Sequence, residues 1–174
     1  WESLGRKDKG ALLTQIGRCM AAAHRLPVGY LSDLPRAWSR FLPMNIVGCL
    51  ARHVHQDAPR WVTDHVDAFV LDALPGLSLG QPHVILTGEY TPFNLLVETV
   101  EGAPSLTGMI DFGDAMVGHP YYEFVAPGCC ITYSSPRLRR AMLLRYGFSE
   151  DQLNERLSRQ LMAHTLTHRF IDVP

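Results

Sequence analysis

The sequence predicts a helix-rich α+β fold, and three observations support that prediction. With 174 residues, 47% of them hydrophobic and 19% charged, the chain can bury the core of one compact unit. Apolar residues recur at three- and four-residue spacing over several segments, which is typical of amphipathic helices. Between these segments, residues 83–110 hold short apolar and β-branched runs that indicate strands. We therefore expect helices packed around a small β-hairpin.

The N-terminal half is predicted to be mainly helical. Apolar spacing and the positions of prolines predict four helices, over about 8–25, 34–41, 46–55 and 58–73. Asp57 is a favourable N-cap for the last of these helices. Trp61 and Phe69 lie on its apolar face, so we expect both of them in the core. Glycines and prolines predict a loop over 75–82.

The strands and two further helices are predicted in the second half. Apolar runs bounded by turn residues predict strands over 84–86, 95–100 and 106–110. The last two are joined by a turn over 101–105 and form the predicted hairpin. Ser135 and Ser149 are then expected to cap helices over about 137–146 and 150–169.

The charges are unevenly distributed along the chain. All basic residues lie in 1–60 and 137–174, so residues 61–136 contain none. We expect this segment to attract metal ions or a positively charged ligand, although acids on helix faces are ordinarily only solvated. Its acids are Asp64, Asp67, Asp72, Glu89, Glu98, Glu101, Asp111, Asp114 and Glu123.

Composition also argues against two classes of partner. A formal net charge of -1 gives no electrostatic basis for nucleic-acid binding. No apolar run reaches the roughly 18 residues of a membrane-spanning helix, so no membrane partner is expected. The four cysteines form no C-x-x-C pair, and we expect free thiols in a reducing cytoplasm.

Three oxygen-bearing residues form the candidate site: Glu89, Asn94 and Asp111. Asn94 precedes the second predicted strand and Asp111 follows the third, so a hairpin places both at its open end. Glu89 lies in the preceding loop, five residues from Asn94. Carboxylate and amide oxygens suit Mg²⁺ and not zinc. Taken alone, such loop residues more often only cap turns.

The spacing of these residues matches the plan by which kinases transfer phosphoryl groups. On that plan a loop carboxylate takes the proton of the acceptor hydroxyl, and an Asn five residues later holds Mg²⁺ together with the Asp of a D-F-G triplet. Here residues 86–97 read L-T-G-E-Y-T-P-F-N-L-L-V, and residues 109–115 read M-I-D-F-G-D-A. Residues 118–123 add a third motif, G-H-P-Y-Y-E.

With these motifs the sequence resembles the aminoglycoside phosphotransferase family. The family pattern is H-G-D-x-x-x-x-N, then I-D-(F/W)-x-x-A and G-x-P-x-x-(D/E), and the resemblance covers roughly residues 12–125. The sequence T-G-E-Y-T-P-F-N of residues 87–94 is most similar to that of hygromycin phosphotransferases. The resemblance implies the C-terminal lobe of the protein-kinase-like fold, with catalytic and metal-binding loops on a small β-hairpin. It also implies a cytoplasmic, antibiotic-resistance kinase that moves the γ-phosphoryl group of ATP or GTP to a hydroxyl of an aminoglycoside-like acceptor.

The resemblance also implies a role for each matching residue. Glu89 matches the catalytic carboxylate, while Asn94 and Asp111 match the residues that bind Mg²⁺ and, through it, the nucleotide. Glu123 matches a structural acid that braces the catalytic loop. Asp114 is a candidate for lining the acceptor site.

Two departures from the family pattern bear on activity. Thr87 replaces the usual His, so bracing of the loop by an imidazole is lost. Glu89 replaces the usual Asp, which extends the carboxylate by about 1.5 Å. Either the loop is set back to suit Glu, or the chain is a pseudokinase-like module that binds a cationic ligand or partner without chemistry.

The sequence lacks the parts that grip a nucleotide in a complete kinase. No Gly-rich phosphate loop or strand lysine precedes residue 89, and Lys7 and Lys9 lie at a helix start. We therefore expect residues 1–174 to form a single C-terminal lobe, with the N-terminal nucleotide-binding lobe absent from this chain. We expect the chain alone to be inactive.

A metal-hydrolase alternative depends on His164 and His168. The two imidazoles are four residues apart on one predicted helix, a spacing that can bind zinc. The Glu of the H-E-x-x-H motif is absent, so the competing expectation is two partly exposed helix histidines.

Overall fold

The computed structural model describes residues 1, 4–30, 38–74, 83–88, 90–132 and 135–169. The helices are α1 (Arg6–Ala23), α2 (Trp38–Val47), α3 (Cys49–His55), α4 (Arg60–Thr63), α5 (Val66–Ala73), α6 (Val125–Cys130), α7 (Pro136–Tyr146) and α8 (Glu155–Thr167). Two 3₁₀ turns are η1 (Val28–Tyr30) and η2 (Pro120–Phe124). The strands are β1 (Val84–Leu86), β2 (Leu95–Val100), β3 (Ala103–Met109) and β4 (Met116–Gly118).

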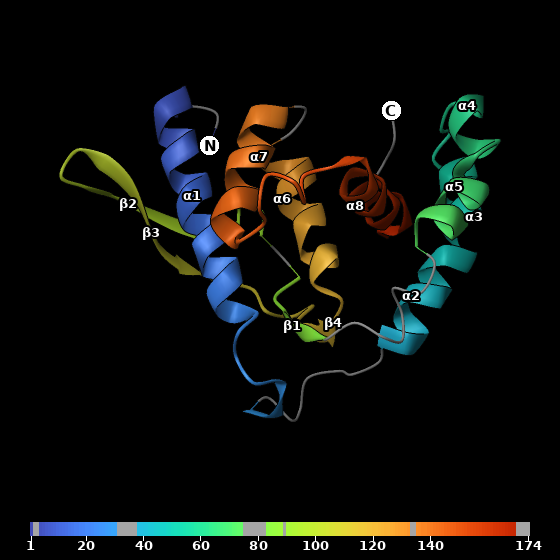
Figure 1. The fold of residues 1–174 in the computed structure, drawn as a ribbon, viewed down its shortest axis with the longest axis horizontal. Coiled ribbons are helices and arrows are strands. Elements are labelled where there is room, and N and C mark those ends of the chain that lie inside the picture. The colour runs from blue at the N-terminus through green and yellow to red at the C-terminus, as the bar shows by residue number, and fades with distance from the viewer. Residues whose placement is uncertain (2–3, 31–37, 75–82, 89, 133–134, 170–174) are drawn as a thin grey trace.

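The helices form two groups, with α8 between them (Figure 1). On one side α1 packs along α7, and on the other α8 packs against α5 and α2. The β2–β3 hairpin projects beside α1, and the small β1–β4 sheet lies below α6 in this view. Both sheets are antiparallel pairs. None of the described helices combines the length and apolar character needed to cross a membrane.

One of two hydrophobic cores lies between α1 and α7. Leu13, Ile16 and Met20 recur at helical spacing and are fully buried there. Gly17 allows the close approach, because a Cβ at this position would lie 2.6 Å from the Met142 carbonyl oxygen. The backbone of α7 therefore rests directly on the surface of α1.

The second core surrounds Trp38, at the start of α2. Its indole ring contacts Tyr122 edge-on, with ring centroids 5.5 Å apart, and lies 6.1 Å from the ring of His164. Gly118 of β4 fits under Trp38, since a Cβ there would lie 2.5 Å from the indole. This core joins α2, η2 and α8 to the β1–β4 sheet.

The predicted helix over 58–73 is two helices in the structure. α4 ends at Thr63 and α5 begins at Val66, and Asp57 has φ 54°, so it is not the N-cap. Pro59 stands at the N-terminus of α4 instead. Trp61 is 70% exposed, so its expected place in the core is wrong, whereas Phe69 does pack against the core.

Other boundaries also shift. The helices predicted over 34–41 and 46–55 appear as α2 and α3, and the loop over 75–82 lies outside the described residues. Ser135 caps α7 as predicted, accepting a hydrogen bond from the Leu138 N–H. Asn154, not Ser149, caps α8. The strands predicted over 84–86 and 95–100 are confirmed. The third spans 103–109 instead of 106–110, because the turn between the hairpin strands is shorter than predicted, and β4 was not predicted.

Candidate functional site

The β1–β4 sheet brings two loops of the candidate site together. Leu86 pairs with Met116, so the loop that follows β1 and the loop that precedes β4 leave the sheet at the same edge. Gly88 in the first loop has φ +87°, and a Cβ there would lie 3.1 Å from the backbone oxygen of Asp114 in the second. Glycine is required here because of both the backbone conformation and the close contact.

The β2–β3 hairpin places Asn94 beside Asp111 along the backbone. Leu95 pairs with Met109, and the Ile110 N–H donates to the Asn94 carbonyl oxygen over 2.9 Å. Asp111 follows directly, with φ 64°, and its Oδ1 accepts from the Gly113 N–H over 3.3 Å. Its carboxylate is exposed to solvent, so one amide-bearing and one carboxylate-bearing residue lie at the open end of the hairpin.

Glu89 lies outside the described residues, but both of its neighbours are held in place. Gly88 packs on Asp114, and Tyr90 is fully buried. The Tyr90 hydroxyl lies 3.7 Å from Cys19 Sγ of α1, and burial raises the pKa of Tyr90 well above its usual range. Within the described parts of the chain, no group of three His, Cys, Asp or Glu side chains is arranged to hold a metal ion.

Glu123 joins the loop after β1 to the core. It is 3% exposed, and its two carboxylate oxygens accept from the Thr87 N–H over 2.8 Å, the Thr87 hydroxyl over 2.7 Å and the Gly88 N–H over 3.0 Å. The expected loss of bracing at position 87 is therefore made good, since the threonine hydroxyl binds Glu123 directly. Hydrogen bonds to a carboxylate are about twice as strong as neutral ones.

A second layer of contacts extends from Glu123 to α1 and α7. His24 Nε2 lies 3.3 Å from Glu123 Oε2, and His24 Nδ1 lies 2.8 Å from the Tyr146 hydroxyl. A neutral imidazole protonated on Nε2 satisfies both contacts, because Nδ1 then accepts from the tyrosine. Burial and the charge of Glu123 raise the pKa of Tyr146 to about 12, which keeps this hydroxyl a donor.

Asp114 forms an ion pair that the sequence did not reveal. Arg169, just beyond α8, donates from Nη2 to Asp114 Oδ1 over 2.7 Å, and both side chains are nearly half exposed. Asp72 is likewise paired with Arg159. The acidic segment over 61–136 is thus partly neutralised by arginines of the C-terminal segment. Contacts between residues more than fifty positions apart leave no local sequence signal.

His164 differs from the expectation of a partly exposed side chain, whereas His168, which follows α8, is partly exposed as expected. His164 is fully buried, its ring nitrogens have no hydrogen-bond partner among the described residues, and burial lowers its pKa to about 3. His168 follows α8 and stacks on Tyr122 with ring centroids 5.2 Å apart. Burial lowers the pKa of His168 to about 4. The His164 ring faces aromatic side chains and not a group of oxygen or sulfur ligands.

The hairpin also presents an apolar surface next to the candidate site. Phe93 is 89% exposed, and further apolar side chains of the hairpin and the following loop are about half exposed. These are Leu96, Val97, Val100, Ile110 and Phe112. Exposed apolar side chains gathered on one element can mark an interaction surface.

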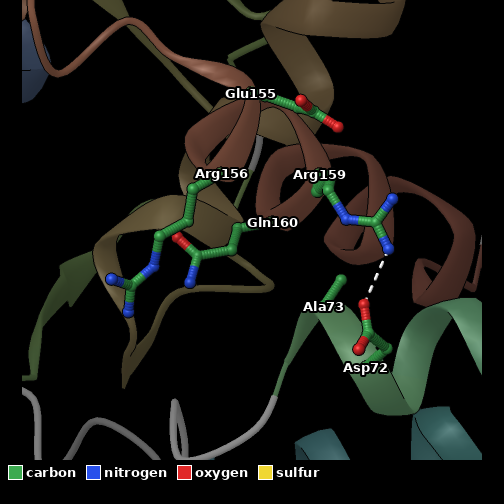
Figure 2. Close-up of a pocket in the computed structure, with 6 residues that line it drawn as sticks. All are labelled: Asp72, Ala73, Glu155, Arg156, Arg159 and Gln160. Atoms are coloured by element: carbon green, nitrogen blue, oxygen red, sulfur yellow. Dashed lines mark hydrogen bonds and ion pairs between the residues drawn. The ribbon is translucent and has the colours of Figure 1, made fainter.

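Two hollows lie elsewhere on the molecule. An apolar groove of about 1160 Å³ runs between α4, α5, α7 and α8, and Trp61, Phe69 and Met162 line part of it. A smaller pocket of about 380 Å³ lies between α5 and α8 and holds the Asp72–Arg159 pair (Figure 2). Neither hollow is lined by a residue of the candidate site.

Known structures share this fold. The structure described as the GDP and kanamycin complex of APH(2")-IIia superposes with a TM-score of 0.71 at 18% identity, covering 94% of this chain and 54% of that chain. The crystal structure of aminoglycoside-3'-phosphotransferase of type VIII gives a TM-score of 0.64 at 15% identity, covering 94% and 61%. These likenesses confirm the predicted helix-rich α+β, kinase-like fold.

Sequence comparison adds the family. Viomycin phosphotransferase of Streptomyces vinaceus is 35% identical over 88 residues, which are 51% of this chain and 28% of that protein. The chain thus matches just over a quarter of that relative and spans about half of the protein in the GDP and kanamycin complex. The phosphotransferase enzyme family, APH, matches residues 2–163. The chain therefore belongs to the phosphotransferase enzyme family.

Proposed function

We propose that this chain is the C-terminal lobe of a small-molecule phosphotransferase. The proposed reaction moves the γ-phosphoryl group of ATP or GTP to a hydroxyl of a cationic, aminoglycoside-like acceptor. Family membership supports the reaction class, and relatives named for viomycin and solved with GDP and kanamycin support the substrate classes. Such an enzyme would confer antibiotic resistance in the cytoplasm, where the nucleotide is supplied.

The observation that carries this proposal is the backbone hydrogen bond between Ile110 and Asn94. It fixes the open end of the hairpin, so the amide of Asn94 and the carboxylate of Asp111 extend from neighbouring positions. Amide and carboxylate oxygens suit Mg²⁺, so the two residues fit the proposed metal. When bound, the metal neutralises charge on the nucleotide phosphates.

We propose that Glu89 is the residue that acts on the acceptor hydroxyl. Its carboxylate is proposed to orient the hydroxyl and to take its proton while the oxygen attacks the γ-phosphorus atom. The bond from that phosphorus to the bridging oxygen breaks, and ADP or GDP leaves. The surrounding contacts support this role indirectly. Glu123 holds the backbone of Thr87 and Gly88 on one side, and Tyr90 is buried on the other. Positioning of this kind supplies much of the catalysis in phosphoryl transfer.

We also propose that a nucleotide-binding lobe covers the apolar surface of the hairpin. Phe93 and Phe112 are exposed beside Asn94 and Asp111, where a nucleotide and a second lobe would exclude water. The proposal predicts that residues 1–174 alone transfer little or no phosphate. Robust turnover by this chain would contradict it.

Substitution of the proposed metal ligands tests the function. In the full-length, two-lobe protein, we expect Asp111→Ala and Asn94→Ala each to lower kcat by at least about a hundredfold, since each removes charge stabilisation of the transition state. Phosphate transfer to kanamycin with ATP or GTP is the measurement. Asp72→Asn, which changes an exposed acid far from the hairpin, is the matched control. Near-normal rates in the first two variants would overturn the assignment.

The alternative is a pseudokinase-like module that binds a cationic ligand without chemistry. The observation in its favour is that glutamate stands at position 89 where the family pattern has aspartate. Glu89→Gln separates the two functions. An enzyme loses its rate and keeps its affinity for the acceptor, whereas a binding module has no rate to lose.

A further inference from the structure

We propose that Arg169 is a built-in competitor at the acceptor site, holding Asp114 until a cationic group of the acceptor replaces it. This inference rests on the proposed function, in which Asp114 lines the acceptor site. Its basis is the 2.7 Å ion pair between Arg169 Nη2 and Asp114 Oδ1. The pair joins the end of α8 to the loop that carries Asp111.

Asp114 is held next to the proposed catalytic residue. Its backbone packs within 3.1 to 3.2 Å of the position that a Cβ of Gly88 would occupy, and Gly88 directly precedes Glu89 in sequence. Asp114 also follows Asp111 by three residues. A cation bound by Asp114 would therefore lie beside the loop that receives the acceptor hydroxyl.

The C-terminus of α8 is held by hydrogen bonds, which fix the position of the backbone just before Arg169. Arg52 of α3 donates to the Thr167 carbonyl oxygen over 2.8 Å, and His53 Nε2 lies 3.0 Å from the Leu166 carbonyl oxygen. These contacts satisfy carbonyls at the C-terminus of α8 that lack partners within the helix. His168 stacks on Tyr122 immediately before Arg169.

The pair is well suited to exchange. The Arg169 side chain is 46% exposed and that of Asp114 is 42% exposed, and ion pairs at this level of exposure add little stability. An anchored arginine nevertheless acts at high effective concentration, so it competes well with a single free ammonium group. An acceptor with several cationic groups can also bind other acids of the segment over 61–136, and these contacts help it to displace Arg169. An acceptor with a single charge lacks these additional contacts. Arg169 therefore favours polycationic acceptors.

Binding of kanamycin to the full-length, two-lobe protein, measured by calorimetry at low salt, tests the inference without requiring catalysis. We expect Arg169→Ala to lower the Kd about two- to fivefold, because the competing cation is gone. In the Asp114→Asn background, Arg169→Ala should have no effect. Arg159→Ala is the matched control, since it removes the same charge from the exposed pair with Asp72 shown in Figure 2.

Each other outcome overturns the inference. An equal gain in Arg159→Ala would show only a general charge effect, and an unchanged Kd in Arg169→Ala would show no competition. Weaker binding would show that Arg169 itself contacts the ligand, as expected if it recognises an anionic group. The proposed function is judged separately: kanamycin phosphorylation that depends on Asp111 keeps the function even if Arg169 has no effect. If Arg169→Ala binds kanamycin more tightly but the two-lobe protein does not phosphorylate it, the inference of competition stands and the proposed enzymatic function is contradicted.

Discussion

Thr87 and Glu123 form a buried polar contact in which each partner depends on the other. The carboxylate of Glu123 would be costly to bury alone, and three of its hydrogen bonds come from Thr87 and Gly88. A threonine hydroxyl thus binds Glu123 at the position where the family pattern has a histidine. The exchange shows why a single departure from a motif is weak grounds for assigning loss of function.

Removing this hydroxyl should destabilise the fold. We expect Thr87→Val, which keeps the shape of the side chain, to lower the free energy of unfolding by about 1–3 kcal/mol, because one carboxylate oxygen loses a buried donor. Urea denaturation followed by circular dichroism measures the change. Thr107→Val is the control, since its exposed hydroxyl donates to a backbone oxygen and should cost under about 0.5 kcal/mol. Equal losses would contradict the role of Thr87.

Among the elements, α1 and α7 make a close contact that depends on a glycine. A Cβ at Gly17 would lie 2.6 Å from the Met142 carbonyl oxygen and 3.1 Å from the Tyr146 nitrogen, both of them backbone atoms. Backbone cannot move aside as the end of a flexible side chain can. The two helices would have to separate to admit even a methyl group.

A matched pair of substitutions in α1 tests this interface. We expect Gly17→Ala to lower the free energy of unfolding by about 1–3 kcal/mol through overpacking. Gly10→Ala, in the same helix with no atom within 4 Å of its Cβ position, should raise it by up to about 1 kcal/mol through helix propensity. Thermal or urea unfolding of the two variants measures both effects. Stabilisation by Gly17→Ala would show that the helices are not in close contact.

The elements that could be predicted are those with a strong local pattern. The apolar stripe of α1, the Ser135 cap of α7 and the apolar and β-branched runs of the hairpin strands are all encoded within a few residues. β4 has only three residues, and its strand character depends on pairing with β1, more than thirty positions away. The start of α8 was misplaced because Ser149 and Asn154 are both good cap residues, and packing selected the second.

The same distinction applies to the candidate site. The proximity of Asn94 and Asp111 follows from hairpin register, which is a local property of the sequence. The pairing of Asp114 with Arg169 depends on how α8 packs across the molecule, so the sequence alone could not reveal it. Trp61 was misplaced because one continuous apolar face was expected over 58–73, whereas the structure has two separate helices there.

Across the whole molecule, three histidines join the aromatic core to α8 and η2. His119 and His164 stack with ring centroids 5.7 Å apart, and His168 lies on Tyr122. Burial lowers the pKa of His119 to about 4, and the neighbouring His83 contributes to the shift. All three rings are therefore neutral at pH 7 in the folded protein.

This arrangement predicts loss of stability in mild acid. The unfolded chain binds protons on these histidines near pH 6.5, whereas the folded chain binds them only near pH 4 or below, so stability is complete above about pH 6.5 and falls as the pH drops from there to 4. We expect a loss on the order of 3 kcal/mol for each fully shifted group. Urea unfolding at pH 7.5, 6.0 and 5.0 measures the slope.

Replacing one of these rings should reduce that slope. His164→Phe keeps an aromatic ring among Trp38, Tyr122 and His119 and removes one titrating group. His55→Gln, which removes an exposed imidazole, is the control for the loss of a histidine as such. A parent protein equally stable at pH 7.5 and pH 5.0 would show that the histidines are not neutral in the fold.

The β2–β3 hairpin begins and ends at the candidate site, so its far turn is a suitable position for a label. The chain leaves the candidate site at Asn94 and returns at Ile110, where the hydrogen bond from the Ile110 N–H to the Asn94 carbonyl oxygen joins the two ends. The exposed turn at Glu101 and Gly102 lies six strand residues away, or about 20 Å. A fluorophore or an inserted peptide tag at that turn can therefore report on binding at the hairpin base without occupying it.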